Sequence, residues 1–165
     1  MVYNIDMIYD LRSSRETKKF AAEMAREILK TKFRSKSAIV LALKGNLGAG
    51  KTTFTQGFLR GLGIKKKITS PTFVIFKRYK LPSFAKASAG RQVNSYKFAY
   101  HIDCYRIKKS QELLILGIKE IFDNPKNIVL IEWPEKISII LPKERINVGF
   151  EYGGKENERK IVIRA

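Results

Sequence analysis

The hydrophobic and polar pattern of the first third of the chain predicts a helix, a strand and a second helix. Ser13 followed by Glu16 is typical of a capping box, and apolar residues recur behind it at helical spacing. These apolar positions are Phe20, Ala21, Met24 and Ile28. The apolar run 38–43, followed by a glycine-rich turn, predicts a buried parallel strand. Residues 51–62 predict a helix that ends at Gly63.

The rest of the chain predicts further strands around one more helix. Strands are expected at Phe73 to Tyr79 and at Tyr96 to Ile102, and Leu81 to Asn94 between them is read as an irregular, mobile insertion. Ser110 is expected to cap a helix that carries Leu113, Leu114, Ile118 and Ile121. The apolar run 127–131 predicts a strand that ends in Glu132. Two tail strands, 145–152 and 159–164, complete a pattern typical of an α/β fold.

Length and composition predict one domain over residues 1–165. The chain is 44% hydrophobic, which suffices for one core. No apolar run approaches the roughly 20 residues of a membrane span, and the N-terminus lacks a signal-peptide pattern. We therefore expect a cytoplasmic protein without a membrane partner. The single cysteine, Cys104, excludes an internal disulfide and agrees with a reducing compartment.

The chain is strongly basic, with 33 Lys and Arg against 15 Asp and Glu, a net charge of +18. Such a charge attracts polyanions, of which tRNA is the obvious cytosolic one. The alternative is that the lysines form an ordinary solvated surface. Screening limits the electrostatic reach of each basic cluster to about 8 Å. The clusters at 65–67 and 108–109 would therefore form a binding patch only if the fold brings such groups together on one side.

Residues Gly45 to Thr52 match the phosphate-binding motif G-x-x-x-x-G-K-[ST] between a predicted strand and a predicted helix. Glycines let the backbone N–H groups converge on phosphate at the positive end of the new helix. Lys51 is expected to reach the β- and γ-phosphates, and the Thr52 hydroxyl to bind Mg²⁺. The predicted nucleotide-binding residues here are Gly48, Ala49, Gly50, Lys51, Thr52 and Thr53.

Two acidic residues follow strands near this motif. Glu132 ends an apolar strand and is expected to hold the metal or orient water; the alternative is an acid that caps a strand end. Asp103 follows another strand and is a second candidate, or else a turn residue. The absence of an Asn-Lys-x-Asp segment favours ATP over GTP, so the predicted cofactors are ATP and Mg²⁺.

Four segments together resemble the TsaE family, the small ATPase of tRNA threonylcarbamoyladenosine synthesis in bacteria. They are Gly45 to Phe54, Ser70-Pro71-Thr72-Phe73, His101-Ile102-Asp103-Cys104-Tyr105-Arg106 and Ile131-Glu132-Trp133-Pro134. The resemblance implies a three-layer P-loop α/β fold with a mainly parallel sheet and antiparallel strands at its edge. It also implies that Thr52 and Glu132 hold Mg²⁺, that Asp103 serves the hydrolytic site, and that Thr72 lies near the γ-phosphate in a switch.

The resemblance further implies that the chain acts with the TsaB and TsaD proteins and meets tRNA through that complex. Its ATP hydrolysis would reset the complex between turnovers, while TsaD transfers the threonylcarbamoyl group. Two features depart from the family: Asn46 stands where Asp is usual, and the 81–94 insertion is long. A small-molecule P-loop kinase with an arginine-bearing lid is the first alternative, and a nucleic-acid-binding module is the second.

Four further residues allow two interpretations each. Cys104 is expected to be a small buried filler rather than a redox group, and His101 a structural hydrogen-bonding group rather than a general base. Trp133 either lies close to the nucleotide or simply packs beside the P-loop. Ser14 approaches the adenine if the family pattern holds, although helix capping explains it equally well.

Overall fold

The computed structural model describes residues 7–30, 36–71, 74–82 and 96–164. In chain order the elements are β1 (Met7–Leu11), α1 (Ser14–Lys30), β2 (Ile39–Gly45), α2 (Lys51–Gly61), β3 (Phe76–Lys80), β4 (Phe98–Asp103), α3 (Gln111–Ile115), α4 (Ile118–Phe122), β5 (Asn127–Glu132), the 3₁₀ helix η1 (Pro134–Ile140), β6 (Ile146–Tyr152) and β7 (Arg159–Arg164). None of the helices in these ranges has the length and apolar content needed to cross a bilayer.

The strands form one mixed sheet in the order β1-β7-β6-β2-β5-β4-β3. The four central strands, β6, β2, β5 and β4, are parallel to one another. The outer strands pair antiparallel at both edges. The predicted fold class, a mainly parallel sheet with antiparallel edge strands, is therefore confirmed. Parallel strands direct their carboxyl ends to the same edge of the sheet, which places the ends of β2, β4 and β5 together.

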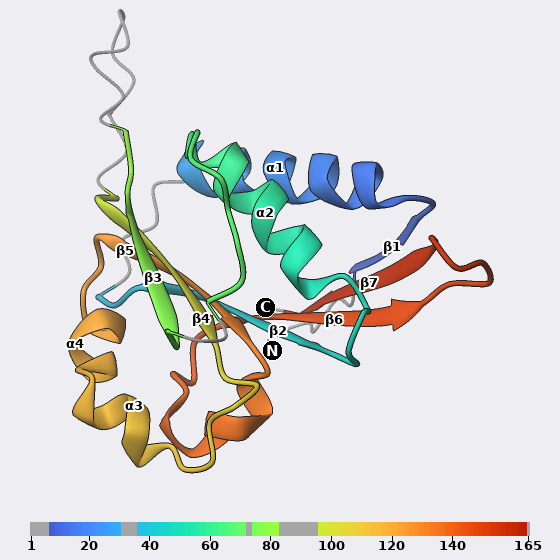
Figure 1. Ribbon diagram of the computed structural model, residues 1–165. Coiled ribbons are helices and arrows are strands. Elements are labelled where there is room, and N and C mark those ends of the chain that lie inside the picture. Colours follow the sequence, from blue (N-terminus) through green and yellow to red (C-terminus); the bar gives the residue numbers. More distant parts are fainter. Residues whose placement is uncertain (1–6, 31–35, 72–73, 83–95, 165) are drawn as a thin grey trace, which may run out of the picture.

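Helices cover the sheet on both faces, as Figure 1 shows: α1 and α2 lie on one face, and α3 and α4 on the other. Each face has its own buried cluster. Phe54, Phe58 and Leu41 belong to the cluster beneath α1 and α2, whereas Ile102 and Leu113 belong to the cluster on the α3–α4 side. Because β2, β4 and β5 contribute alternate residues to the two clusters, both faces of the central strands are buried.

The two long helices pack closely and run in the same direction. A Cβ atom on Gly57 would lie 2.4 Å from the carbonyl oxygen of Lys18, and one on Gly61 would lie 2.4 Å from that of Ala22. The two contacts are four residues apart on each helix, so they fix a parallel register. The N-terminus of α1 consequently lies at the same end of the layer as the P-loop, which precedes α2.

The predicted first helix and its cap are confirmed. The N–H of Glu16 donates to Ser13 Oγ at 3.2 Å, and the Glu16 carboxylate accepts the N–H of Arg12 at 2.8 Å. The Glu16 side chain thus accepts the N–H of Arg12, the residue before the cap, whereas a standard capping box uses the N–H of the cap residue, here Ser13. The strand around 38–43, the helix from Lys51 and the tail hairpin also form at the predicted places.

Other predicted elements differ from the structure. The strand expected from residue 73 begins only at Phe76, because Ile75 has a φ of 64°, which no extended strand allows. The single helix expected after Ser110 is two short ones, separated at Gly117 by its φ of 76°, and Ser110 makes no side-chain cap. Strand β1 and helix η1 were not predicted.

The predicted insertion, residues 81–94, is described only at its start. Leu81 is buried in the main cluster, and its N–H donates to the Lys97 carbonyl at 2.9 Å. Leu81 is therefore part of the core, whereas the sequence predicted an irregular, mobile insertion from this residue onward. Residues 83–95 lie outside the described residues.

Candidate functional site

A cleft of about 340 Å³ opens where the carboxyl ends of β4 and β5 meet the N-terminus of α2. Its walls come from the P-loop, the segment before β3, and the residues just after β4 and β5. The lining residues are Leu47, Gly48, Gly50, Lys51, Thr52, Thr53, Ser70, Asp103, Tyr105, Glu132 and Trp133. The predicted phosphate loop and both predicted carboxylates thus share one cavity, of a size typical for small-molecule sites.

The loop between β2 and α2 has the backbone that an anion site requires. Gly48 and Gly50 have φ values of 76° and 103°, a left-handed conformation that favours glycine. The first turn of α2 carries no acidic residue, and Gly50 caps it without a side chain. The free N–H groups of this helix start, together with its positive dipole end, therefore remain available to an anion.

Lys51 is held against the loop by backbone carbonyls. Its Nζ donates to the oxygens of Gly45 at 2.7 Å and Asn46 at 2.8 Å, and it lies 3.9 Å from the centre of the Trp133 ring. Burial lowers the pKa of Lys51, an effect that the nearby carboxylates of Glu132, Glu135 and Asp103 oppose. An incoming phosphate would give this partly desolvated ammonium a stronger, charged acceptor.

Thr52, Glu132 and His101 form a continuous chain of contacts. The Thr52 hydroxyl donates to Glu132 Oε2 at 2.9 Å, and His101 Nε2 lies 2.8 Å from Glu132 Oε1. A carboxylate only accepts hydrogen bonds, so Nε2 carries the proton in this contact. His101 and Glu132 are both buried. One carboxylate oxygen is therefore fixed by the histidine, while the other points at the P-loop hydroxyl.

Asp103 lies beside Glu132, because the two are paired in the parallel register of β4 and β5. Its carboxylate accepts hydrogen bonds from the Ser70 hydroxyl at 2.8 Å and from the N–H of Tyr105 at 3.0 Å. The first contact ties the carboxylate to the Ser70 to Phe73 segment that the sequence identified as a switch. Thr72, the predicted γ-phosphate contact, lies outside the described residues.

Trp133 adopts a left-handed backbone conformation, with a φ of 59°, directly after β5. Its ring packs over Lys51 and lies 5.2 Å from that of Tyr105, centre to centre. The packing beside the P-loop that the sequence predicted is present, and the ring also lines the cleft; a position close to the nucleotide stays a prediction. A strained backbone at a cleft wall is a recurring feature of functional sites.

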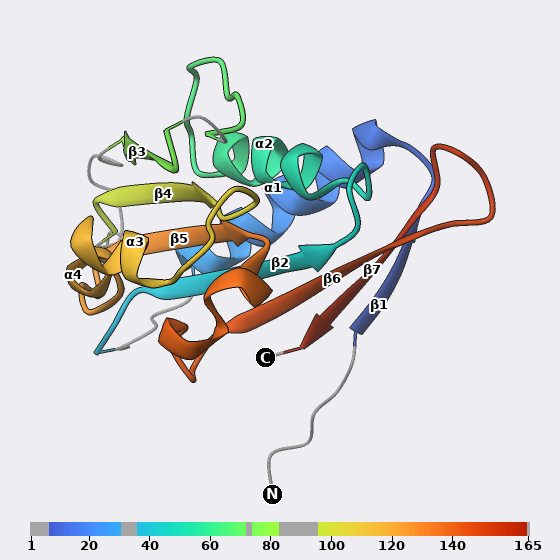
Figure 2. The same cartoon turned by 60° about the horizontal axis from the view of Figure 1, so that its bottom comes forward.

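Two residues of the β6–β7 hairpin contact the P-loop from outside, and no motif in the sequence pointed to either of them. The Tyr152 hydroxyl donates to the Leu47 carbonyl, and Arg159 Nη2 donates to the Gly48 carbonyl at 3.1 Å. The Arg159 guanidinium also lies over the Tyr152 ring, 5.3 Å from its centre. Figure 2 shows this hairpin extending past the end of β2 toward the loop that precedes α2.

Ser14 and Cys104, which the sequence also singled out, both lie outside the lining of the cleft. Ser14 is exposed at the start of α1, at the end of the helical layer where the P-loop lies, and it does not line the cleft. Cys104 is buried, and burial, with the Asp103 and Glu135 charges, raises the pKa of its thiol to about 12. The predicted burial of Cys104 is thus confirmed, and the raised pKa disfavours the thiolate, which is the reactive form.

The cleft residues fit a nucleotide phosphate chain and Mg²⁺. The described residues contain no group of three or more His, Cys, Asp or Glu side chains that could hold a metal alone. Mg²⁺ typically takes only one or two protein carboxylates and completes its shell with phosphate and water. Thr52 Oγ1 and Glu132 Oε2, 2.9 Å apart, are a donor set of that kind beside an anion-binding loop.

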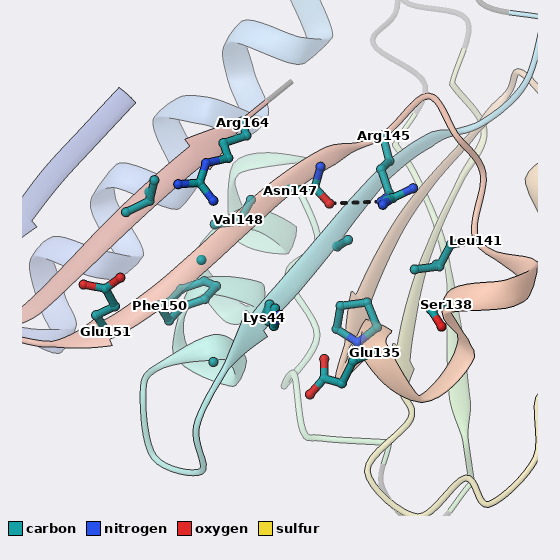
Figure 3. A pocket seen from close by; sticks show the side chains of 15 residues that line it. Lys44, Glu135, Ser138, Leu141, Arg145, Asn147, Val148, Phe150, Glu151 and Arg164 are labelled. Carbon is teal, nitrogen blue, oxygen red and sulfur yellow. Dashed lines mark hydrogen bonds between the residues drawn. The ribbon is translucent and has the colours of Figure 1, made fainter. Parts of the chain in front are cut away.

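A larger hollow, of about 490 Å³, lies apart from the cleft, between β2, β6, β7 and η1. Figure 3 shows Arg145 and Asn147, joined by a hydrogen bond, together with Arg164, Glu135 and Glu151 around it. The lining mixes both signs of charge. Its lining includes none of residues 48–53 and neither Asp103 nor Glu132, so the smaller cleft is the candidate active site.

Comparisons with known proteins identify the family of the chain. The sequence profile of a family described as "Threonylcarbamoyl adenosine biosynthesis protein TsaE" matches residues 11–161. The chain is 40% identical over 135 residues to the tRNA threonylcarbamoyladenosine biosynthesis protein TsaE of Haemophilus influenzae, covering 82% of this chain and 73% of that one. It is 39% identical over 134 residues to the protein of the same name from Bacillus subtilis, covering 79% and 72%.

A solved structure has the same fold. The structure described as "Crystal structure of Bacillus subtilus YdiB" superposes with a TM-score of 0.70 at 32% sequence identity, and the match covers 100% of this chain and 88% of that one.

Proposed function

Because the chain belongs to the TsaE family of tRNA threonylcarbamoyladenosine biosynthesis, we propose that it is the Mg²⁺-dependent ATPase of that modification system. The observation that carries the proposal is the contact between Thr52 of the P-loop and Glu132 of β5, at 2.9 Å, beside the free N–H groups of α2. A hydroxyl and a carboxylate so placed are the usual protein ligands of nucleotide-bound Mg²⁺.

Each cleft residue has a role that its contacts allow. The N–H groups from Gly48 to Thr53 bind phosphate oxygens, and the Lys51 ammonium exchanges its two carbonyl acceptors for β- and γ-phosphate oxygens. Bound Mg²⁺ supplies further neutralisation of the charge that develops on those oxygens. His101 holds Glu132 in the orientation that faces Thr52. The reaction thus depends on positioning and charge neutralisation, with no covalent nucleophile.

Asp103 is the residue we assign to the attacking water. Its carboxylate lines the cleft next to Glu132 and is oriented by the Ser70 hydroxyl and the Tyr105 N–H. A carboxylate held in this way can accept a hydrogen bond from water and align it with the γ-phosphate. Since Ser70 belongs to the switch segment, a change of that segment would also move Asp103.

The proposed role in the cell is to reset the TsaB–TsaD complex between turnovers, with tRNA reached through that complex. Family membership is its support. The chain itself would not transfer the threonylcarbamoyl group.

The decisive experiment measures ATP hydrolysis by the full chain, alone and with TsaB and TsaD, for wild type, Glu132→Ala and the control Glu135→Ala. Glu135 is a nearby exposed acid outside the cleft lining. We expect TsaB and TsaD to stimulate the wild type and the control, and Glu132→Ala to be inactive. Normal turnover by Glu132→Ala would refute the metal site. Hydrolysis indifferent to TsaB and TsaD would leave an ATPase and remove the resetting role, which would direct attention to small-molecule phosphate acceptors.

A further inference from the structure

A third hollow, at the edge of the sheet and apart from the P-loop cleft, is a basic groove. Its volume is about 670 Å³, and it runs between the loop after α2 and the edge strand β3. Lys65 and Lys66 form one bank and Lys77 of β3 forms the other, while Arg78 and Lys80 also line the hollow from β3. β3 begins beside Asp103 and ends at Lys80, paired with Phe98 at the start of β4. The groove therefore lies toward the amino ends of the parallel strands, away from the nucleotide cleft.

The charge of this basic groove is not neutralised within the described part of the chain. No acidic residue lines it, and none of its five cations forms an ion pair with a described carboxylate. Lys77 Nζ instead donates to the Thr69 carbonyl and hydroxyl, and Arg78 lies over the Phe98 ring at 5.0 Å. The hollow of Figure 3, by contrast, has Glu135 and Glu151 beside its cations.

The floor of the groove is rigid and apolar. Ile64 and Leu81 are each only 6% exposed and belong to the main core cluster, and Tyr79 packs against the same cluster. Strand alternation directs Lys77 and Tyr79 to one face of β3 and Arg78 and Lys80 to the other. Lys77 therefore lies on the face of β3 that bears the apolar floor, and Arg78 and Lys80 lie on the other face of this edge strand. A groove with cationic banks and an apolar floor matches a flexible chain of phosphates that carries flat, apolar-faced bases.

We propose that this basic groove binds the backbone of an RNA, in an unpaired or loop segment. Two banks of lysines can contact successive phosphates while ribose and base lie on the floor. RNA is favoured over an acidic peptide because the family acts in tRNA modification, and the inference rests on that membership. It does not require the proposed ATPase activity, because the groove and the cleft share no lining residue.

The test is fluorescence anisotropy of a fluorescein-labelled RNA hairpin titrated with full-length protein at several salt concentrations. The groove variant is K65Q/K66Q/K80Q, and the matched control is K108Q/K109Q/K119Q, which removes three equally exposed charges on the α3–α4 side. We expect the groove variant to lose at least about tenfold in affinity and to lower the slope of log K against log salt by roughly two to three. The control should lose less than about twofold.

Two additional measurements make the outcome specific. K65R/K66R/K80R keeps the charge and should bind the hairpin as the wild type does. Thermal stabilisation by Mg-ATP should be unchanged in the groove variant, so failure of the RNA proposal is distinguishable from failure of the nucleotide proposal.

Equal losses of RNA affinity in the groove and control variants would overturn the proposal. RNA would then be attracted by the positive charge of the whole surface and not by the groove. Unchanged RNA binding together with lost binding of poly-L-glutamate would also overturn it, in favour of an acidic protein partner.

Discussion

At the scale of single residues, the cleft depends on buried charged and polar groups that satisfy one another. Lys51, Asp103 and Glu132 are between 3% and 5% exposed, and each has at least one hydrogen-bond partner. Burying such groups without partners would cost several kcal/mol. The arrangement therefore keeps these charged groups buried in the cleft at a cost that the folded protein can bear.

Lys51→Ala should abolish the thermal stabilisation by Mg-ATP. Ligand at about 100 times its dissociation constant stabilises a protein by about 2.7 kcal/mol, and this gain depends on the ammonium at the phosphates. The control is Lys44→Ala, which removes an exposed lysine of β2. This variant should keep the full shift. The measurement is the melting temperature with and without Mg-ATP, and an equal shift in Lys51→Ala would contradict the role of the loop.

His101→Phe should weaken the response to Mg²⁺ by about 10- to 100-fold, the usual effect of removing a group that orients a metal ligand. Without the Nε2 contact at 2.8 Å, Glu132 can turn away from Thr52. His101→Gln keeps an N–H donor and should restore part of the response. The readout is the Mg²⁺ concentration at half-maximal hydrolysis; equal values for the Phe and Gln variants would argue for a purely structural histidine.

At the scale of elements, the P-loop is supported by three neighbours at once. β2 leads into it, α2 continues from it, and the β6–β7 hairpin contacts the carbonyls of Leu47 and Gly48 from outside. With these carbonyls bound by the hairpin, the N–H groups at the start of α2 remain available to an anion. The position of α2 is set in turn by its close packing against α1.

Gly57→Ala should destabilise the fold by about 1–3 kcal/mol, because its Cβ would meet the Lys18 backbone at 2.4 Å. Helix propensity alone predicts the opposite sign, a gain of about 1 kcal/mol for Ala over Gly. The urea unfolding midpoint therefore decides between packing and propensity. Gly154→Ala is the control, because its nearest neighbour would be a Glu158 side-chain oxygen at 3.6 Å, and it should leave the midpoint nearly unchanged.

At the scale of the whole molecule, one sheet holds two surfaces for which we propose different tasks. The cleft lies at the carboxyl ends of β4 and β5, and the basic groove lies along β3 near their amino ends. The segment between α2 and β3 joins them, since it starts at the groove with Lys65 and reaches the cleft with Ser70. An RNA contact and the nucleotide site would thus be connected through a few residues.

Global stability should fall at alkaline pH partly because of Cys104. Burial raises the pKa of its thiol from 9.0 to about 12, so above pH 9 the unfolded chain loses the proton while the folded chain keeps it. The contribution of the neutral thiol is complete below pH 9 and is lost progressively as the pH rises from 9 to about 12.

The measurement is the free energy of unfolding against pH, under reducing conditions, for wild type and Cys104→Ala. The wild type should decline more steeply than the variant above pH 9. Parallel curves would contradict a buried neutral thiol.

The sequence by itself determined the features that rest on short-range patterns. Glycines and a lysine at fixed spacing specify the loop at 45–52, apolar periodicity specifies α1 and α2, and the unbroken apolar run at 127–131 specifies a fully buried strand. These features depend on backbone conformation and side-chain spacing within a dozen residues, which one sequence records directly. The cap at Ser13 belongs to the same group.

Only the tertiary structure decided which distant residues meet. The Thr52 and Glu132 side chains are separated by 80 positions, and the Tyr152 and Leu47 contact spans 105. Strand β1 was not predicted, because Met7 and Ile8 are both exposed and the strand is defined by its pairing with β7. Strand order, register and helix packing bring such groups together, and they depend on contacts across the whole chain that local periodicity does not encode.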